Sequence, residues 1–261
     1  MPNNTPISDL LDSLRSISGE YPKTTIAALF ARRSESVPAM LDVFRDRMEL
    51  YKDVALRDEQ MPFFALYILA QMRESALCPL LLDVLRYPFE DDGDLDAFWG
   101  DILFEDVPSI LLSVYDGNLQ ALAALALDRD VMRAIRFVAL QTIGLLYAHG
   151  EVEREAFFAV LRKVYAQEKN SKEEYDFVLT GFCGLVFDLQ LHEFAEDAKM
   201  LIRNQLKDFA KPGDLDEALR GDAKNVRAKF MQVPVHQKIQ DVEQSTEWWV
   251  SQVLEPNSDE I

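Results

Sequence analysis

The chain has few glycines, the residues that most often interrupt helices and form tight turns. Only 10 occur in 261 residues, and the segments between breakers are long. Few segments alternate apolar and polar residues as a half-buried strand does, whereas many repeat apolar residues every three or four positions. Hydrophobic residues make up 49% of the chain and charged residues 28%, a balance typical of globular domains. The sequence therefore predicts an all-α fold.

Cysteine and histidine are also scarce. Cys78 and Cys183 fall in separate apolar helical stretches, so we expect buried reduced thiols. None of the three histidines, His149, His192 and His236, has a His or Cys partner three or four positions away. A zinc site is therefore not expected, and His149 is interpreted as a residue that stabilises a helix end. Glycine-rich phosphate loops are missing too, so no cofactor is predicted.

Long apolar runs are missing as well. No uncharged apolar run approaches the ~18 residues that a membrane span needs. The first residues, 1–16, lack the order of a signal peptide, a basic region followed by an apolar one. We therefore expect a cytoplasmic protein that does not contact a membrane.

Basic residues are outnumbered, 27 against 45 acidic ones, which gives a net charge of −18. Such a field repels phosphate backbones and anionic lipid, so binding to nucleic acid or to a membrane surface is disfavoured. The charge helps a protein with large apolar helix faces to stay in solution. It also suits a basic protein partner.

A short internal echo predicts how the helices are arranged. Residues 62–86, PFFALYILAQMRESALCPLLLDVLR, contain two apolar helices joined by a polar turn. Residues 79–86 repeat the pattern of residues 38–45 at an offset of 79 − 38 = 41 positions, within the roughly 40–47 residues of HEAT-type repeats. We therefore expect a HEAT-like α-solenoid of stacked antiparallel helix pairs, with Leu82 and Leu140 in its core.

Apolar stripes and helix breakers predict the remaining helices. Three of them begin near Pro6, Pro22 and Pro38, and a further one follows Asp106. The other expected helices cover residues 119–127, 131–149, 154–165, 173–189, 193–209 and 235–254.

The chain is expected to have two parts. Residues 1–210 would form the HEAT-like array, and residues 211–261 a C-terminal extension with a capping helix and a frayed tail from residue 255. Adjacent helical positions point about 100° apart. One of Trp248 and Trp249 is therefore expected to be buried against the last helix pair.

Residues 87–128 contain no lysine or arginine and ten acidic residues. Asp91, Asp92, Asp94 and Asp96 are interpreted as an acidic loop. An EF-hand register with Gly93 in sixth place puts Pro88 first and Trp99 twelfth, so a calcium loop is not predicted. Other acids of the span are expected to pair with arginines such as Arg86 and Arg136. The candidate partner-binding residues are Asp91, Asp92, Asp94, Asp96, Asp101, Glu105 and Asp106.

Three stretches give the chain a family resemblance: residues 65–88, 98–122 and 131–152. The order of these pieces resembles a bacterial family called domain of unknown function 1186, over roughly residues 5–210. Many members carry Thr where this chain has Phe104. The resemblance implies a HEAT-like helical array and no particular activity. Some relatives append a cysteine-rich zinc motif, which we do not expect here because the only cysteines are Cys78 and Cys183.

These observations are compatible with three functions. The leading hypothesis is a non-enzymatic scaffold that docks a basic protein segment, because stacked helix pairs present an extended binding surface. The alternative is a hydrolase-like enzyme that uses Asp101, Glu105 and Asp106 in an acidic groove. The third, DNA repair on a HEAT-like scaffold that resembles the alkylpurine glycosylases, ranks last because it needs a basic groove.

Overall fold

The structure, a computed structural model, describes residues 5–15, 20–45, 60–171, 176–221 and 225–254. Within these residues the regular elements are helices and no strand occurs, so the all-α prediction is confirmed. None of the described helices is both long enough and apolar enough to cross a membrane. The predicted frayed tail, 255–261, and the first residues of the helix expected from 173 lie outside the described residues.

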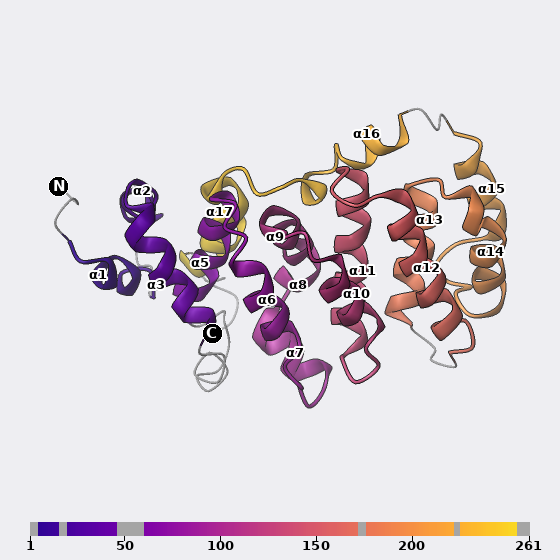
Figure 1. Cartoon of the computed structure of the whole chain (residues 1–261), viewed down its shortest axis with the longest axis horizontal. Helices are drawn as coiled ribbons and strands as arrows, with labels where there is room; N and C mark the ends of the chain where they lie inside the picture. Colours follow the sequence, from indigo (N-terminus) through magenta and orange to yellow (C-terminus); the bar gives the residue numbers. More distant parts are fainter. Residues whose placement is uncertain (1–4, 16–19, 46–59, 172–175, 222–224, 255–261) are drawn as a thin grey trace.

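Where the connections lie in the described residues, the helices follow one another closely (Figure 1). Those of the first part are α1 (Ile7–Asp12), α2 (Lys23–Ala31), α3 (Arg33–Arg45), α5 (Gln60–Gln71) and α6 (Leu77–Leu85). Those of the middle are α7 (Asp92–Trp99), α8 (Ile102–Glu105), α9 (Val107–Val114), α10 (Leu119–Leu127), α11 (Arg133–Ala148) and α12 (Arg154–Glu168). The last are α13 (Phe177–Asp188), η1 (His192–Phe194), α14 (Ala195–Asn204), α15 (Pro212–Leu219), α16 (Val226–Phe230), η2 (Pro234–His236) and α17 (Val242–Leu254).

Neighbouring helices pack against each other in chain order, from α1 at one end of the molecule to α14 and α15 at the other (Figure 1). The two segments of the sequence echo lie in α3 and α6, which contact each other, and α3 also packs against α5. Further along, α9 lies between α5 and α11, and α11 lies between α9 and α13. Leu82 and Leu140 are both buried, as predicted.

One helix start that was predicted from a proline is wrong. The sequence placed a helix start at Pro38, but α3 begins at Arg33 and continues through this proline. Proline in a helix interior removes one backbone hydrogen bond. The turn before it is held from outside, since the buried Ser36 hydroxyl donates to the carbonyl oxygen of Leu29 in α2. Tertiary packing therefore outweighs the local preference.

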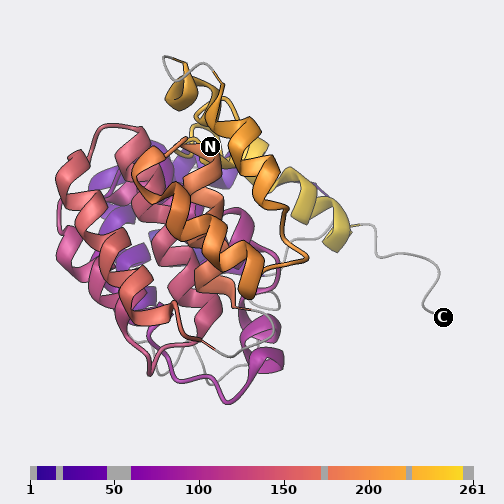
Figure 2. The ribbon, with the colours of Figure 1, turned by 90° about the vertical axis from the view of Figure 1, so that its right-hand side faces the viewer.

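Helix α5 explains why the chain must return on itself. Every residue from Gln60 to Ala70 is buried, and a helix that is apolar all round needs cover on all sides. Residues 225–250, here called the return segment, run back from the α15 end along one side of the stack (Figures 1 and 2). In this segment η2 packs on α9 and α17 packs on α5.

The return segment corrects the expected position of the tryptophan pair. Trp249 is buried, as one of the two was expected to be, but it lies on Phe63 and Phe64 of α5. The prediction that it packs against the last helix pair is therefore wrong. Trp248, its neighbour, is half-buried.

Polar contacts hold the return segment at three places along its length. Thr246 Oγ1 lies 2.7 Å from the Tyr21 hydroxyl oxygen. The backbone N–H of Ile239 donates to Ser113 Oγ at 2.8 Å. Before Ile239, His149 Nε2 lies 2.8 Å from the carbonyl oxygen of His236. His149 does follow the end of α11, as expected, but its ring binds the return segment.

The cysteines are free and buried, as the sequence predicted. Burial raises the pKa of the Cys78 thiol to about 11 and that of the Cys183 thiol to about 12. Since the thiolate is the nucleophilic form, both side chains act as apolar packing groups at neutral pH.

Candidate functional site

The four aspartates predicted to form a loop lie instead at the start of a helix. Asp91 is the N-cap of α7 and its Oδ1 accepts a hydrogen bond from the backbone N–H of Asp94 at 3.0 Å. Asp92 and Asp94 lie in the first turn, and Asp96 is exposed one turn later. Negative side chains stabilise the positive end of the helix dipole. The loop interpretation is therefore wrong, and helix capping accounts for part of the cluster.

The other three candidate residues surround α8. Asp101 is exposed and precedes this helix, Glu105 is its last residue, and Asp106 separates it from α9. Glu105 and Asp106 line a common pocket, whereas Asp101 does not. The structure therefore does not bring together the three carboxylates on which the hydrolase hypothesis was built.

Of the two arginines predicted to pair with the acidic span, one does so and the other does not. Arg86 Nη1 lies 4.0 Å from Asp128 Oδ2, so this arginine does pair with the acidic span. Arg136 does not, because its Nη2 binds Glu168 Oε1 at 2.5 Å in α12.

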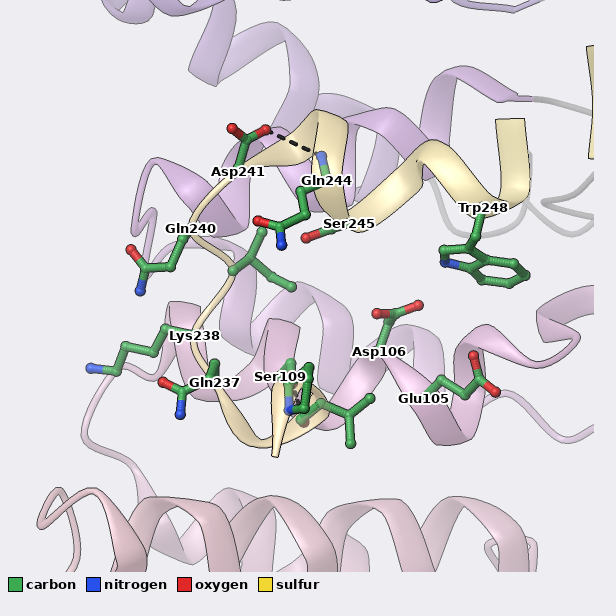
Figure 3. Close-up of a pocket in the computed structure, with 13 residues that line it drawn as sticks. Glu105, Asp106, Ser109, Gln237, Lys238, Gln240, Asp241, Gln244, Ser245 and Trp248 are labelled. Carbon is green, nitrogen blue, oxygen red and sulfur yellow. Dashed lines mark hydrogen bonds between the residues drawn. The ribbon is translucent and has the colours of Figure 1, made fainter. Parts of the chain in front are cut away.

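The pocket lies between the α8–α9 junction and the return segment and has a volume of about 380 Å³. The junction contributes Glu105, Asp106 and Ser109 to its wall (Figure 3). In Figure 3 the Asp106 carboxyl group points toward the space below α17, near the Trp248 ring. The lining residues of the return segment include Val235, Lys238, Ile239, Asp241, Gln244 and Trp248.

Asp106 carries the strongest electrostatic perturbation in this pocket. Burial raises the pKa of its carboxyl group to about 6, and the charge of Glu105 adds to the rise. The hydroxyl group of Tyr67 faces it and opposes the rise. This contact falls short of hydrogen-bond geometry, because among the described residues neither Asp106 Oδ2 nor the Tyr67 hydroxyl oxygen, both buried, has a hydrogen-bond partner. At neutral pH the pocket thus holds a carboxylate whose charge is poorly compensated.

Three other polar side chains of the pocket, those of Ser109, Lys238 and Asp241, are already engaged. Ser109 Oγ donates to the carbonyl oxygen of Val235 at 2.5 Å. Asp241 Oδ1 accepts from the backbone N–H of Gln244 at 3.3 Å, the dashed line in Figure 3. Lys238 Nζ lies 2.7 Å from Glu151 Oε1.

The two carboxylates of the junction differ from these groups. Neither Glu105 nor Asp106 has an ion-pair partner in the described part of the chain. The described residues as a whole contain no group of three or more His, Cys, Asp or Glu side chains suited to hold a metal ion.

A second surface feature adjoins the pocket, a group of three phenylalanine rings that we call the aromatic patch: Phe104, Phe137 and Phe177. Phe104 is 41% exposed and Phe177 42%. These two rings stack, with centroids 5.8 Å apart and planes 16° apart. Phe137 closes the triangle, with centroids 5.9 Å from Phe104 and 6.3 Å from Phe177.

The chain holds the Phe137 ring in place from below. A Cβ atom at Gly181 would lie 2.7 Å from Cδ2 of this ring, so only glycine leaves room for it. Gly181 therefore marks a close contact between α13 and α11. The patch joins three helices, α8, α11 and α13, on a fixed support.

Sequence reasoning did not find the patch, because its three residues lie far apart along the chain. Phe137 falls outside the apolar stripe of its helix, which is a signal of an outward-facing aromatic side chain. The sequence predicted one wall of the pocket, the one with Glu105 and Asp106. It did not predict the other wall, because no pattern links the return segment to these two residues.

Comparison with known proteins places the chain among uncharacterised relatives. A family model described as protein of unknown function (DUF1186) matches residues 5–253. An uncharacterised protein of Chlamydia trachomatis is 27% identical over 183 residues, which are 69% of this chain and 71% of the relative. One of Chlamydia muridarum is also 27% identical, over 69% of this chain and 72% of the relative. No solved structure matches the chain.

Proposed function

This chain belongs to the DUF1186 family, whose description assigns no function, and we propose that it is a protein-binding scaffold. The partner is a basic amphipathic segment of another protein, which docks on the aromatic patch. The observation that carries the proposal is the stacked, exposed pair Phe104 and Phe177.

Exposed clustered aromatic rings are unusual on a protein surface. Contiguous apolar patches mark interaction sites, and aromatic side chains contribute most of the binding energy at many interfaces. A single exposed phenylalanine needs no explanation, but three rings from three helices form a continuous apolar surface. The support beneath Phe137 keeps this surface in shape before a partner arrives, which lowers the entropic cost of binding.

The charges beside the patch select the partner. Asp101 lies three positions before Phe104, so it shares a helix face with this ring, and Glu105 follows Phe104 directly. Both carboxylates are exposed. A segment with lysine or arginine around its apolar side chains complements them. A second copy of this chain does not, because each copy carries a net charge of −18.

Fluorescence anisotropy with two synthetic peptides tests the proposal. One is a labelled 14-residue Leu/Lys amphipathic helix, and the other has Glu in place of every Lys. We expect the basic peptide to bind and the acidic one not to bind. The double variant Phe104→Ser/Phe177→Ser should weaken binding at least tenfold, as loss of an aromatic hot spot does.

A matched control is available in Phe209→Ser. Phe209 is 39% exposed and has Phe187 as an aromatic neighbour, but it lies outside the patch. We expect this variant to bind the basic peptide like the wild type. Equal affinity for the two peptides, or equal loss in both variants, would contradict the proposal.

A second candidate function, hydrolysis assisted by Asp106, is favoured by one observation. A carboxyl group with a pKa of about 6 is suited to general acid–base catalysis near neutral pH. Chromogenic esters, glycosides and amides would test it. Turnover by the wild type that Asp106→Asn abolishes supports hydrolysis, whereas no turnover, or equal turnover in both proteins, contradicts it.

A further inference from the structure

We propose that the pocket between the α8–α9 junction and the return segment binds an organic cation. The ligand class is a primary ammonium or guanidinium group on a short apolar stem. Its head lies at the Asp106 carboxylate and its stem lies against the Trp248 ring. None of the three phenylalanines of the aromatic patch is among the lining residues of this pocket, so the site does not depend on the proposed docking function.

The first argument is the charge that the pocket leaves uncompensated. Lys238, the one basic residue among the described residues that line the pocket, pairs with Glu151. In Figure 3 Lys238 also lies at the opposite end of the pocket from Asp106. Asp241 caps α17. Among the described residues, therefore, no basic side chain competes with an entering cation for the carboxylates of Asp106 and Glu105.

The second argument is the shape and chemistry of the wall. Trp248 presents an aromatic ring beside Asp106, and Val235 and Ile239 add apolar surface. Cations are attracted to the face of an indole ring, and an apolar stem gains from contact with the same surface. A wall of this kind is typical of sites for organic ligands, which combine apolar surface with a few polar groups.

A metal ion fits the same pocket poorly. Calcium takes six to eight oxygen ligands, and magnesium requires an octahedral arrangement. The described residues contain no cluster that supplies such a set. An ammonium or guanidinium group needs only one or two carboxylate oxygens, to which it donates charge-assisted hydrogen bonds.

The titration of Asp106 gives the binding a characteristic pH dependence. The groups that face it are Glu105 from its own junction and Tyr67 from α5. Across the pocket, the return segment supplies Lys238 and Asp241. Because only the ionised carboxylate attracts a cation, affinity should fall as the pH drops below the pKa of Asp106, about 6. A bound cation should in turn lower that pKa.

The test is an NMR titration of the uniformly ¹⁵N-labelled chain with three compounds: n-butylguanidinium, n-butylammonium, and n-butylurea, which is the uncharged analogue of n-butylguanidinium with the same shape. We expect n-butylguanidinium to shift the Trp248 indole N–H and the backbone resonances around Asp106. The urea analogue should shift neither. No shift with n-butylguanidinium or n-butylammonium, or equal shifts with the urea, would overturn the proposal.

Variants connect the binding to the named residues. Asp106→Asn keeps the shape of the side chain and should weaken n-butylguanidinium at least tenfold, and Trp248→Leu should weaken it severalfold. Asp101→Asn removes an acid outside the pocket and should have little effect. Equal weakening by Asp106→Asn and Asp101→Asn would indicate a general charge effect and would refute the site.

Two further arms identify the source of the cation and separate this site from the aromatic patch. If the Leu/Lys peptide displaces n-butylguanidinium, the natural ligand is a lysine or arginine side chain of a partner. If both bind without competition, it is a free amine or guanidine. The double variant Phe104→Ser/Phe177→Ser should retain n-butylguanidinium binding. The proposed docking function can therefore be disproved without disproving this cation site. Loss of n-butylguanidinium in that variant would contradict an independent site.

Discussion

Trp249 lies on Phe63 with the two ring centroids 4.1 Å apart, and this contact joins the last described helix to α5. The consequence is that the stack of helices is closed along one side by its own C-terminal residues. The pocket exists only because of this arrangement, since one wall belongs to the α8–α9 junction and the other to the return segment.

Trp249→Ala should therefore destabilise the whole fold. A buried tryptophan contributes about 3–5 kcal/mol relative to alanine, and Trp249 is buried against two aromatic rings of α5. Urea denaturation measures the loss, with Trp248→Ala as the control because Trp248 is half-buried. A smaller loss in Trp249→Ala than in Trp248→Ala would show that the return segment is not part of the core.

The two leucines of the central helices provide a test of the array itself. Leu82 in α6 and Leu140 in α11 are buried, and truncation of either one to alanine should cost about 2–5 kcal/mol. The free energy of unfolding from urea titrations gives the value. Losses under about 1 kcal/mol in both variants would mean that the buried faces of these helices are assigned incorrectly.

Asp106→Asn should stabilise the protein at neutral pH while it removes the charge from the pocket. The folded-state pKa, about 6, lies above the unfolded value near 3.9, so ionisation of this group favours the unfolded chain. The gain in the variant should be small at pH 4, grow between about pH 4 and 6, and reach up to about 3 kcal/mol above pH 6.

Denaturation of both proteins at pH 4 and pH 8 checks this sign. A gain confined to pH 4, or a loss at pH 8, would show that the Asp106 carboxylate is not under electrostatic strain. A stabilising substitution at a residue that binds a ligand is the trade-off expected of a functional site.

The buried ion pair of Arg136 and Glu168 should behave in the opposite way. Both side chains are almost fully buried, and Arg136 Nε also donates to the carbonyl oxygen of Ala126. Glu168→Gln leaves a buried arginine without its counter-charge, which should cost about 3–5 kcal/mol. The double variant Arg136→Met/Glu168→Leu should recover most of that loss in the same thermal or urea assay. Failure to recover would mean that the pair is net stabilising.

The sequence predicted what local periodicity controls. The stripes of α5, α6 and α11 indicated the all-α class, the central helix pair and the buried positions Leu82 and Leu140. Asp106 was correctly identified as the residue before α9. These predictions hold because the positions of apolar residues along one helix decide which face is buried.

Long-range packing could not be predicted in this way. Residues 225–250 return along the stack because the other helices leave part of the apolar surface of α5 uncovered. The periodicity of the sequence does not indicate which segment covers that surface. The aromatic patch has the same origin, because Phe104, Phe137 and Phe177 meet only in the fold. Asp91 was misplaced since a short acidic run before Leu95 resembles a loop as much as a capped helix start.

Site-specific photo-crosslinking tests the docking of a basic segment most directly. The photoreactive residue p-benzoylphenylalanine is introduced in place of Phe104, and in a separate protein in place of Phe209. Each protein is irradiated with an equimolar mixture of the Leu/Lys and Leu/Glu peptides. We predict adducts at position 104 that contain the Leu/Lys peptide in at least tenfold excess, with few adducts at position 209. Equal yields at the two positions, or equal capture of both peptides at position 104, would contradict the account.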